Sequence, residues 1–239
     1  LWVKRGERMT AEEARRLMGE ISKRTNLPIA LEGIYRWIVF LPSRLDQRVA
    51  VPNRYFGVFR DGSLKTRGIE CNRRDTAPFV AKAQREALEK LAALPEGRAL
   101  DSAIGEVVRL WRQYVADLRD GRLPLEALLI SQRVSRAPEE FQAASPAARA
   151  LAQLARTGQR RRPGQRVCFI YTRGAPGVYA WDLPRPPDPA AVDTKRYEEL
   201  LVRAADTILR PLGVPEEKTR SWLLSNAYQQ ALPFGGAPV

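Results

Sequence analysis

The spacing of apolar and polar residues divides the first third of the chain into a helix and several strands. Thr10 is followed three residues later by Glu13, the spacing of a capping box, and the next apolar residues recur at helical intervals, so a helix is predicted over residues 10–25. The stretch "PIALEGIYRWIVFLP" is rich in β-branched and aromatic residues. It predicts one or two strands with a bend at Gly33.

A β-hairpin is predicted where the chain reads "RYFGVFRDGSLKTRGIE". Its central Asp-Gly pair supplies the positive φ that a tight hairpin turn requires. Because side chains alternate between the two faces of a strand, Tyr55 and Gly57 should share one face, and Phe56 and Val58 the other. One face can therefore belong to the core while the other is a contact surface.

From Thr76 onward the apolar period becomes helical, which places the best domain boundary near residue 75. The expected elements are a helix from Thr76, a helix over about 100–120 that closes on Gly121, a strand around 125–136, a short helix ending at Gly158, a strand "RVCFIYTRG", a Pro-rich connection, two terminal helices and a frayed tail "ALPFGGAPV". The predicted fold class is α+β, with an antiparallel sheet before the boundary and a mainly helical unit with a small β element after it.

Composition excludes several classes of protein. No apolar run approaches the roughly 18 residues of a membrane span, and the only cysteines are Cys71 and Cys168, so we expect no membrane, no export, no disulfide framework and a reducing cytoplasm. The absence of His excludes His general bases, His zinc sites and Ser-His-Asp triads within the chain. No Gly-rich phosphate loop of the Walker type and no Cys/His metal spacing are present, and the carboxylates are scattered.

The formal net charge of +13 and pI of about 10.3 suggest a polyanionic partner, most simply nucleic acid. An Arg and Ala bias from a GC-rich genome would also raise the charge, so clusters carry more weight than the total. Arg54 and either Lys65 or Arg67 could converge on one groove that binds phosphates, and Gly57 and Gly68 would permit a close approach of the backbone there. Alternatively, these basic side chains are simply solvated. The sequence leaves both interpretations open.

Two further basic stretches and four aromatic residues each allow a functional and a purely structural interpretation. In "NRRD" we expect Asp75 to cap the following helix, while its arginines could bind phosphate. For the loop "RTGQRRRPGQR" simple solvation is favoured unless a groove lies beside it. The aromatic residues in apolar periodic contexts are expected in the core: Trp37, Trp111, Tyr114 and Trp222.

Read as ordered blocks, "RYFGVFRDGSLKTRGIECNRRDTAPFVAKAQREALEKLA" resembles the end of the palm and the start of the thumb in family B DNA polymerases. The counterparts of the family's "KKRY" strand, "TRG-x-E-x-x-RRD" segment and thumb-helix Gln are Arg54–Tyr55, Thr66–Arg67–Gly68, Glu70, Arg73–Arg74–Asp75 and Gln84. The blocks "LPLEALLISQRVSR", "ALAQLA", "RPGQRVCFIY" and "RYEELLVRAADTILRPLG" follow in the family's thumb order. Nearly the whole chain is covered, and a prokaryotic divergent subgroup is the most similar.

The resemblance implies that residues 1–75 are the C-terminal part of a polymerase palm and residues 76–239 a thumb domain, serving DNA replication and repair in the cytoplasm, at the nucleoid. Primer–template DNA would be the partner, and the DNA-binding residues would be Arg54, Tyr55, Lys65, Thr66, Arg67, Gly68, Arg73, Arg74, Arg133 and Arg136.

The resemblance also implies that this chain holds no catalytic and no metal-binding residue. The chain begins "LWVKRGERMT" and is expected to be a fragment. The family's catalytic aspartates should end immediately before Leu1, so Mg²⁺ and the deoxynucleotide would be bound upstream and the isolated chain would be inactive.

Two other functional classes are compatible with parts of the sequence. A catalytically inactive polymerase paralogue could act as a DNA-binding accessory protein, and the sequence upstream of Leu1 would decide this. A basic RNA-binding domain explains the charge but not the ordered motifs. The tail "QQALPFGG" lacks the paired aromatic residues of a sliding-clamp peptide, so we expect no clamp contact from it.

Overall fold

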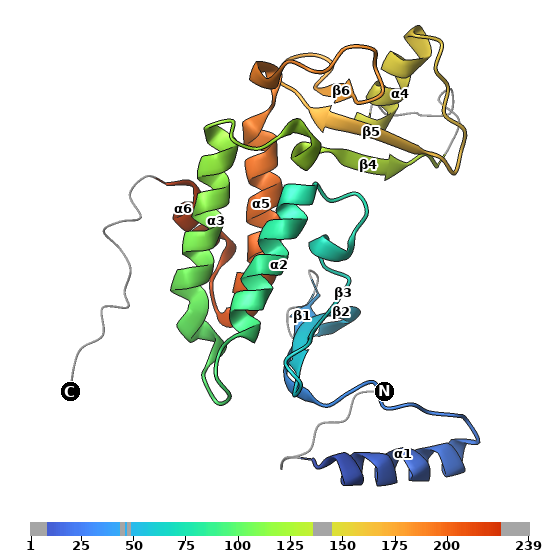
Figure 1. The fold of residues 1–239 in the computed structure, drawn as a ribbon, viewed down its shortest axis with the longest axis vertical. Helices are drawn as coiled ribbons and strands as arrows, with labels where there is room; N and C mark the ends of the chain where they lie inside the picture. Colours follow the sequence, from blue (N-terminus) through green and yellow to red (C-terminus); the bar gives the residue numbers. More distant parts are fainter. Residues whose placement is uncertain (1–8, 44–45, 47–48, 136–144, 226–239) are drawn as a thin grey trace, which may run out of the picture.

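The computed structural model describes residues 9–43, 46, 49–135 and 145–225. Helix α1 (Ala11–Thr25) begins with the predicted capping box, in which the Glu13 amide donates to Thr10 Oγ1 over 3.2 Å and the Thr10 amide donates to Glu13 Oε2 over 2.8 Å. The helix lies apart from the rest of the molecule, beyond an extended connection (Figure 1). Within it only Ala14 is buried.

The first sheet contains β1 (Tyr35–Pro42), β2 (Ala50–Phe59) and β3 (Leu64–Arg67), antiparallel and in that order. The predicted hairpin is confirmed, and in its turn Gly62 has a φ of +87°. "PIALEGIYRWIVFLP" forms one strand, which begins at Tyr35.

The centre of β2 is buried on both faces, from Tyr55 to Val58. Phe56 packs edge-on against Trp37, with ring centroids 6.2 Å apart, and Tyr55 packs against Phe40 at 5.7 Å. The predicted contact face is therefore wrong at this point, because aromatic residues of β1 lie on both sides of β2.

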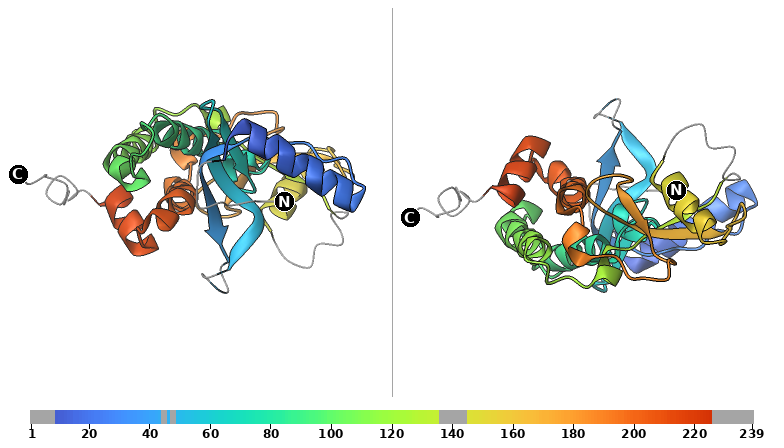
Figure 2. Two further views of the ribbon diagram at one scale, coloured as in Figure 1. Left: turned by 90° about the horizontal axis from the view of Figure 1, so that it is seen from below. Right: turned by 90° about the horizontal axis from the view of Figure 1, so that it is seen from above.

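The mainly helical unit is built around α2 (Pro78–Ala92), α3 (Ile104–Arg119) and α5 (Thr194–Leu209), with α6 (Glu216–Leu224) packed against α3 and α5. A 3₁₀ turn, η2 (Leu100–Ala103), leads into α3. After the end of α3, Gly121 has a φ of +66°, as the sequence predicts for the residue that closes this helix. Viewed along the long axis, these helices lie on one side of the β1–β3 sheet and α1 lies on the other (Figure 2).

A second antiparallel sheet contains β4 (Ile130–Arg133), β5 (Arg166–Tyr171) and β6 (Val178–Ala180), with α4 (Pro146–Arg156) packed against β5 and β6. The strand expected at 125–136 is shorter than predicted, because its first part is a 3₁₀ turn, η3 (Leu125–Leu128). Strand β6 was not predicted. The Pro-rich connection carries another short turn, η5 (Pro189–Ala191), and the predicted frayed tail lies outside the described residues.

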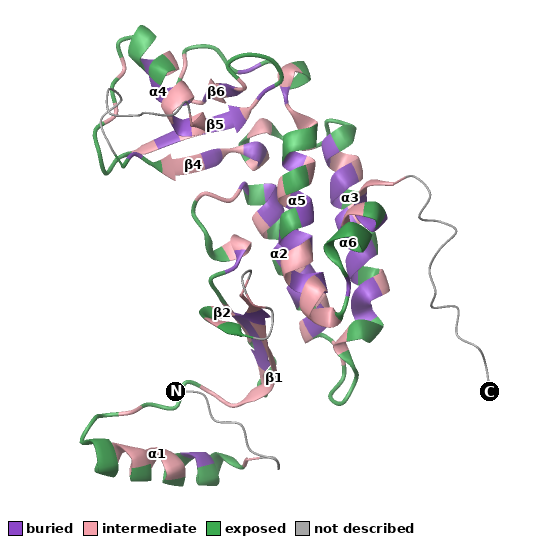
Figure 3. Ribbon diagram, turned by 180° about the vertical axis from the view of Figure 1, so that it is seen from behind, coloured by how far each residue is buried: buried purple, intermediate pink, exposed green. Residues whose placement is uncertain are grey.

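One hydrophobic core extends from the first sheet through the helices to the second sheet (Figure 3). It includes Phe56 and Ile69 before residue 75 and Trp111 and Tyr197 after it. Three of the four aromatic residues expected in the core are buried, and Trp37 is half-buried against it. The α+β class with small antiparallel sheets is confirmed, while the division at residue 75 stays a prediction.

Candidate nucleic-acid interface

Six of the predicted DNA-binding residues lie in what we call the connecting segment, residues 65–75, which leads from the end of β3 through η1 (Glu70–Asn72) toward α2. Gly68 has a φ of +66°, and its carbonyl accepts a 3.1 Å hydrogen bond from Nε of Arg54. The Arg54 side chain is thereby held against the segment. The other hairpin residue, Tyr55, is only 2% exposed and offers no side-chain surface to a ligand.

Several polar side chains of the connecting segment are engaged within the protein. Lys65 Nζ lies 2.6 Å from Glu32 Oε1, and Asn72 Nδ2 donates to Thr66 Oγ1 over 3.1 Å. Arg73 donates to both carboxylate oxygens of Asp75, over 2.9 and 2.7 Å. These contacts leave the cations at the surface but fix their direction.

Asp75 does not cap the following helix, contrary to the sequence prediction. The residue before α2 is Ala77, which has no capping side chain, and Pro78 begins the helix. The Asp75 carboxylate faces the Arg73 guanidinium instead, and this hydrogen-bonded pairing lowers the pKa of Asp75. Both carboxylate oxygens of Asp75 are occupied by this charge-assisted, bidentate contact with Arg73.

Three exposed arginines, Arg67, Arg74 and Arg133, have side chains that make no hydrogen bond or ion pair with any residue that the structure describes. A hydrated guanidinium can exchange its water for a phosphate without breaking a protein contact. Among the predicted DNA-binding residues that the structure describes, these three are therefore the cations that can bind a phosphate without giving up a protein partner.

The second sheet carries one of them next to the connecting segment. Arg133 of β4 stands opposite Arg166 of β5, and Arg166 Nη2 donates to the backbone carbonyl of Arg74 over 3.0 Å. Arg74 and Arg133 are thus brought to neighbouring places although the chain separates them widely. Arg136, the last of the predicted set, lies outside the described residues.

Two functional candidates escaped the sequence interpretation. Arg166 appeared only as a member of a basic loop, yet it is the first residue of β5 and bonds to protein oxygens. Gln84 was noted as a motif residue without a role, yet it is fully buried. The available signal was a lone amide side chain in the apolar stripe of a helix, where a polar group must find partners.

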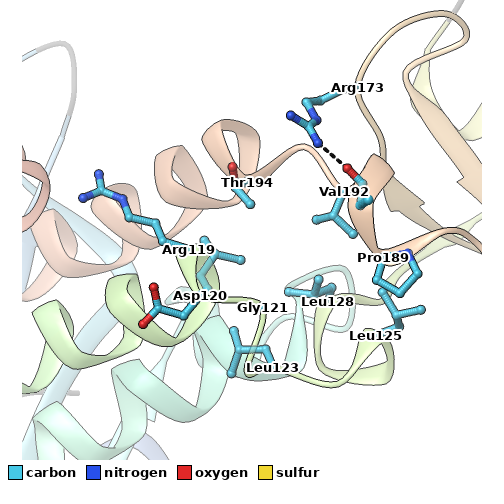
Figure 4. Close-up of a pocket in the computed structure, with 12 residues that line it drawn as sticks. Arg119, Asp120, Gly121, Leu123, Leu125, Leu128, Arg173, Pro189, Val192 and Thr194 are labelled. Carbon is cyan, nitrogen blue, oxygen red and sulfur yellow. Dashed lines mark hydrogen bonds between the residues drawn. The ribbon is translucent and has the colours of Figure 1, made fainter.

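A cavity of about 430 Å³ lies between the end of α3 and the start of α5, remote from the connecting segment along the chain (Figure 4). Leucines line much of it, and its two arginines are already engaged: Arg173 donates to the Ala190 carbonyl, and Arg119 Nε donates to Glu198 Oε1 over 2.6 Å. None of the predicted binding residues that the structure describes lines this cavity.

Within the described ranges, no three acidic, Cys or His side chains gather as a metal-binding group. The described residues thus offer no cluster that would fit Mg²⁺, and the expectation that residues upstream of Leu1 bind the ion stays a prediction. Among the same residues, no helix is long and apolar enough to cross a membrane.

Comparison with known proteins identifies the family. The model of DNA polymerase family B matches residues 9–207. "DNA polymerase 2" of Aeropyrum pernix is 25% identical over 211 residues, covering 87% of this chain and 24% of that protein. The DNA polymerase of Thermococcus kodakarensis is 26% identical over 198 residues, covering 81% of this chain and 11% of that protein.

The fold is also found in a solved structure. The family B DNA polymerase of the hyperthermophilic archaeon Pyrobaculum calidifontis superimposes with a TM-score of 0.62 at 23% identity, over 86% of this chain and 25% of that one. The chain thus spans about a quarter of that protein and of the Aeropyrum relative. Since the family model covers most of its length, the chain belongs to DNA polymerase family B.

Proposed function

We propose that this chain is the C-terminal palm and thumb portion of a DNA-directed DNA polymerase and that it holds primer–template duplex for nucleotidyl transfer. The palm part would be residues 1–75 and the thumb residues 76–239. One observation carries the proposal: a chain of this family presents exposed arginines without protein partners, Arg67, Arg74 and Arg133, on the connecting segment and on the adjoining sheet.

In this proposal the three arginines bind backbone phosphates of the duplex and release its counterions, which gives affinity without sequence preference. Arg54, Lys65 and Arg73 add cations whose direction is already set by Gly68, Glu32 and Asp75. Thr66 and Gly68, the chain neighbours of Arg67, would lie beside the duplex. Tyr55, buried against Phe40, supports the hairpin rather than touching DNA through its side chain.

The reaction of the intact polymerase would be attack of a primer 3′-hydroxyl on the α-phosphate of a deoxynucleotide, in the cytoplasm and at the nucleoid. The described residues offer no cluster of three acidic, Cys or His side chains, and in this proposal the Mg²⁺ of the intact polymerase would be held by residues upstream of Leu1. The contribution of this chain is to align the duplex, and alignment of reactants can supply a large part of a rate enhancement.

Salt dependence of DNA binding tests the proposal. We expect the 239-residue chain to bind a 20-base-pair duplex with an affinity that falls steeply with salt, and the triple variant Arg67→Ala, Arg74→Ala, Arg133→Ala to reduce the slope of log K against log[salt] by about three. The control is Arg122→Ala, Arg210→Ala, Arg220→Ala, which removes the same charge from arginines paired with acids. If both triple variants lose the same affinity and the same salt slope, the proposed site is overturned.

A primer-extension assay tests the prediction that this chain does not catalyse nucleotidyl transfer by itself. With primer–template, deoxynucleotides and Mg²⁺, we expect the purified chain to incorporate no nucleotide. Template-directed extension by this chain would contradict the proposal that this portion binds the duplex while residues upstream of it carry out nucleotidyl transfer.

A further inference from the structure

The connecting segment is held from behind by a buried amide on α2. Gln84 is fully buried, and its Oε1 accepts a 2.7 Å hydrogen bond from the backbone amide of Cys71. Its Nε2 donates to Glu70 Oε2 over 2.8 Å and to the carbonyl of Ala204 in α5 over 3.0 Å. One side chain therefore joins the segment to two helices.

Glu70 makes this attachment firmer, because its second carboxylate oxygen is also used. Thr207 Oγ1, one turn beyond Ala204 on α5, lies 3.1 Å from Glu70 Oε1. Both amide protons of Gln84 face acceptors, so rotating the amide would set its oxygen against Glu70 and Ala204. The arrangement has one satisfactory orientation.

The other end of the segment is held by Arg166 of the second sheet. Its Nη2 donates to the Arg74 carbonyl over 3.0 Å, while Nε donates to Ser131 Oγ over 2.6 Å. The half-buried guanidinium is thus directed at protein oxygens. Beyond its hairpin partners, the segment is thus held at the Cys71 amide by α2 and at the Arg74 carbonyl by β5.

We propose that Gln84 and Arg166 are positioning residues that set where Arg67, Arg73 and Arg74 meet the phosphates of the duplex. This inference rests on the proposed function. Backbone hydrogen bonds at positions 71 and 74 hold the peptide groups on either side of Arg73. The hydrogen bonds of the segment to α2, α5 and β5 then decide whether the cations reach several phosphates at once.

A neutral substitution provides the sharpest test. Gln84→Met keeps the size and removes every hydrogen bond of the amide, and the matched control is Gln153→Met, whose amide joins α4 to β6 by bonds of 2.7 Å to Val178 and 2.9 Å from Ala180. We expect Gln84→Met to weaken duplex binding about tenfold and to reduce the salt slope by about one, since a phosphate contact is lost although no charge changes. Gln153→Met should leave both quantities unchanged.

Amide hydrogen exchange at Cys71 measures, in the absence of DNA, whether Gln84 holds the connecting segment. Exchange should accelerate about tenfold or more in Gln84→Met and not in Gln153→Met, because only the first loses the acceptor of that amide. If the wild-type chain fails to bind DNA, the proposed function fails, whereas this measurement still decides whether Gln84 holds the segment.

A second pair keeps the test independent of how well Gln84→Met folds. Arg166→Met and Arg149→Met each remove one charge and the hydrogen bonds of a guanidinium to backbone carbonyls, those of Arg74 and Ser131 in the first case and that of Pro176 in the second. We expect about tenfold weaker binding for Arg166→Met relative to Arg149→Met. Equal affinities and salt slopes within both pairs would overturn the positioning role and leave the proposed function standing.

Discussion

Gly68 and Asn53 lie so close across the hairpin that a Cβ built on Gly68 would stand 2.3 Å from the carbonyl oxygen of Asn53. The same Cβ would lie 2.9 Å from Cγ of Arg54, whose Nε donates to the Gly68 carbonyl. The close approach of two backbones at this point therefore requires glycine. The same close approach brings the Gly68 carbonyl to Nε of Arg54, and this hydrogen bond fixes the position of the Arg54 guanidinium.

Replacing Gly68 with alanine should destabilise the chain by about 2–4 kcal/mol, of which about 1 kcal/mol reflects the positive φ and the remainder the clash with Asn53. The control is Gly62→Ala in the β2–β3 turn, where φ is +87° but no atom lies within 4 Å of the new Cβ. Urea unfolding followed by circular dichroism gives both values. Equal destabilisation by the two substitutions would contradict the steric argument.

Neutralising Glu32 should release a cation toward the duplex. Glu32 lies 2.6 Å from Lys65 and raises the pKa of that amine, so Glu32→Gln is expected to increase duplex affinity about two- to fivefold at low salt. Fluorescence anisotropy measures the change. The gain should vanish in a Lys65→Met background, and Glu106→Gln, beside Lys90 on α2, should give no gain.

The phenol of Tyr197 joins two elements of the core. It donates to the Leu128 carbonyl over 2.7 Å and accepts from the Tyr171 amide over 2.9 Å. Tyr197→Phe should therefore cost about 1–3 kcal/mol of unfolding free energy, because both backbone groups lose their partner. Tyr179→Phe, which removes a bond from the half-buried Tyr179 to the exposed Arg185 carbonyl, should cost less than about 1 kcal/mol. If Tyr197→Phe lowers the unfolding free energy no more than Tyr179→Phe does, the stabilising role of the two Tyr197 hydrogen bonds is disproved.

Stability should depend on pH through Asp75. The pairing with Arg73 lowers the pKa of this carboxyl in the folded chain, so its contribution is fully present above the ordinary aspartate pKa and is lost as the pH falls through the lowered value. Comparing the wild type with Asp75→Asn from pH 7 down to pH 2, we expect the difference in unfolding free energy to be constant down to about pH 5 and to shrink below about pH 4. A difference that grows toward acid would contradict the pairing.

Local patterns were sufficient for most elements. The capping box at Thr10, the Asp-Gly turn of the hairpin and the helical stripe that buries Trp111 each depend on residues close together in the chain, and each is found in the structure. The short strand β6 was missed because three residues carry too little periodicity to predict a strand.

The sequence by itself determined the α+β class, the order of most elements and the ordered motifs by which the family can be named. Only the tertiary structure decided what the polar side chains touch: Asp75 turns to Arg73, Tyr55 is buried against Phe40, and Gln84 reaches Ala204, 120 residues away. The reason is physical. Helical and strand periods follow from local backbone geometry, whereas a buried or charged side chain takes whichever partner the packing of distant segments brings within hydrogen-bond reach.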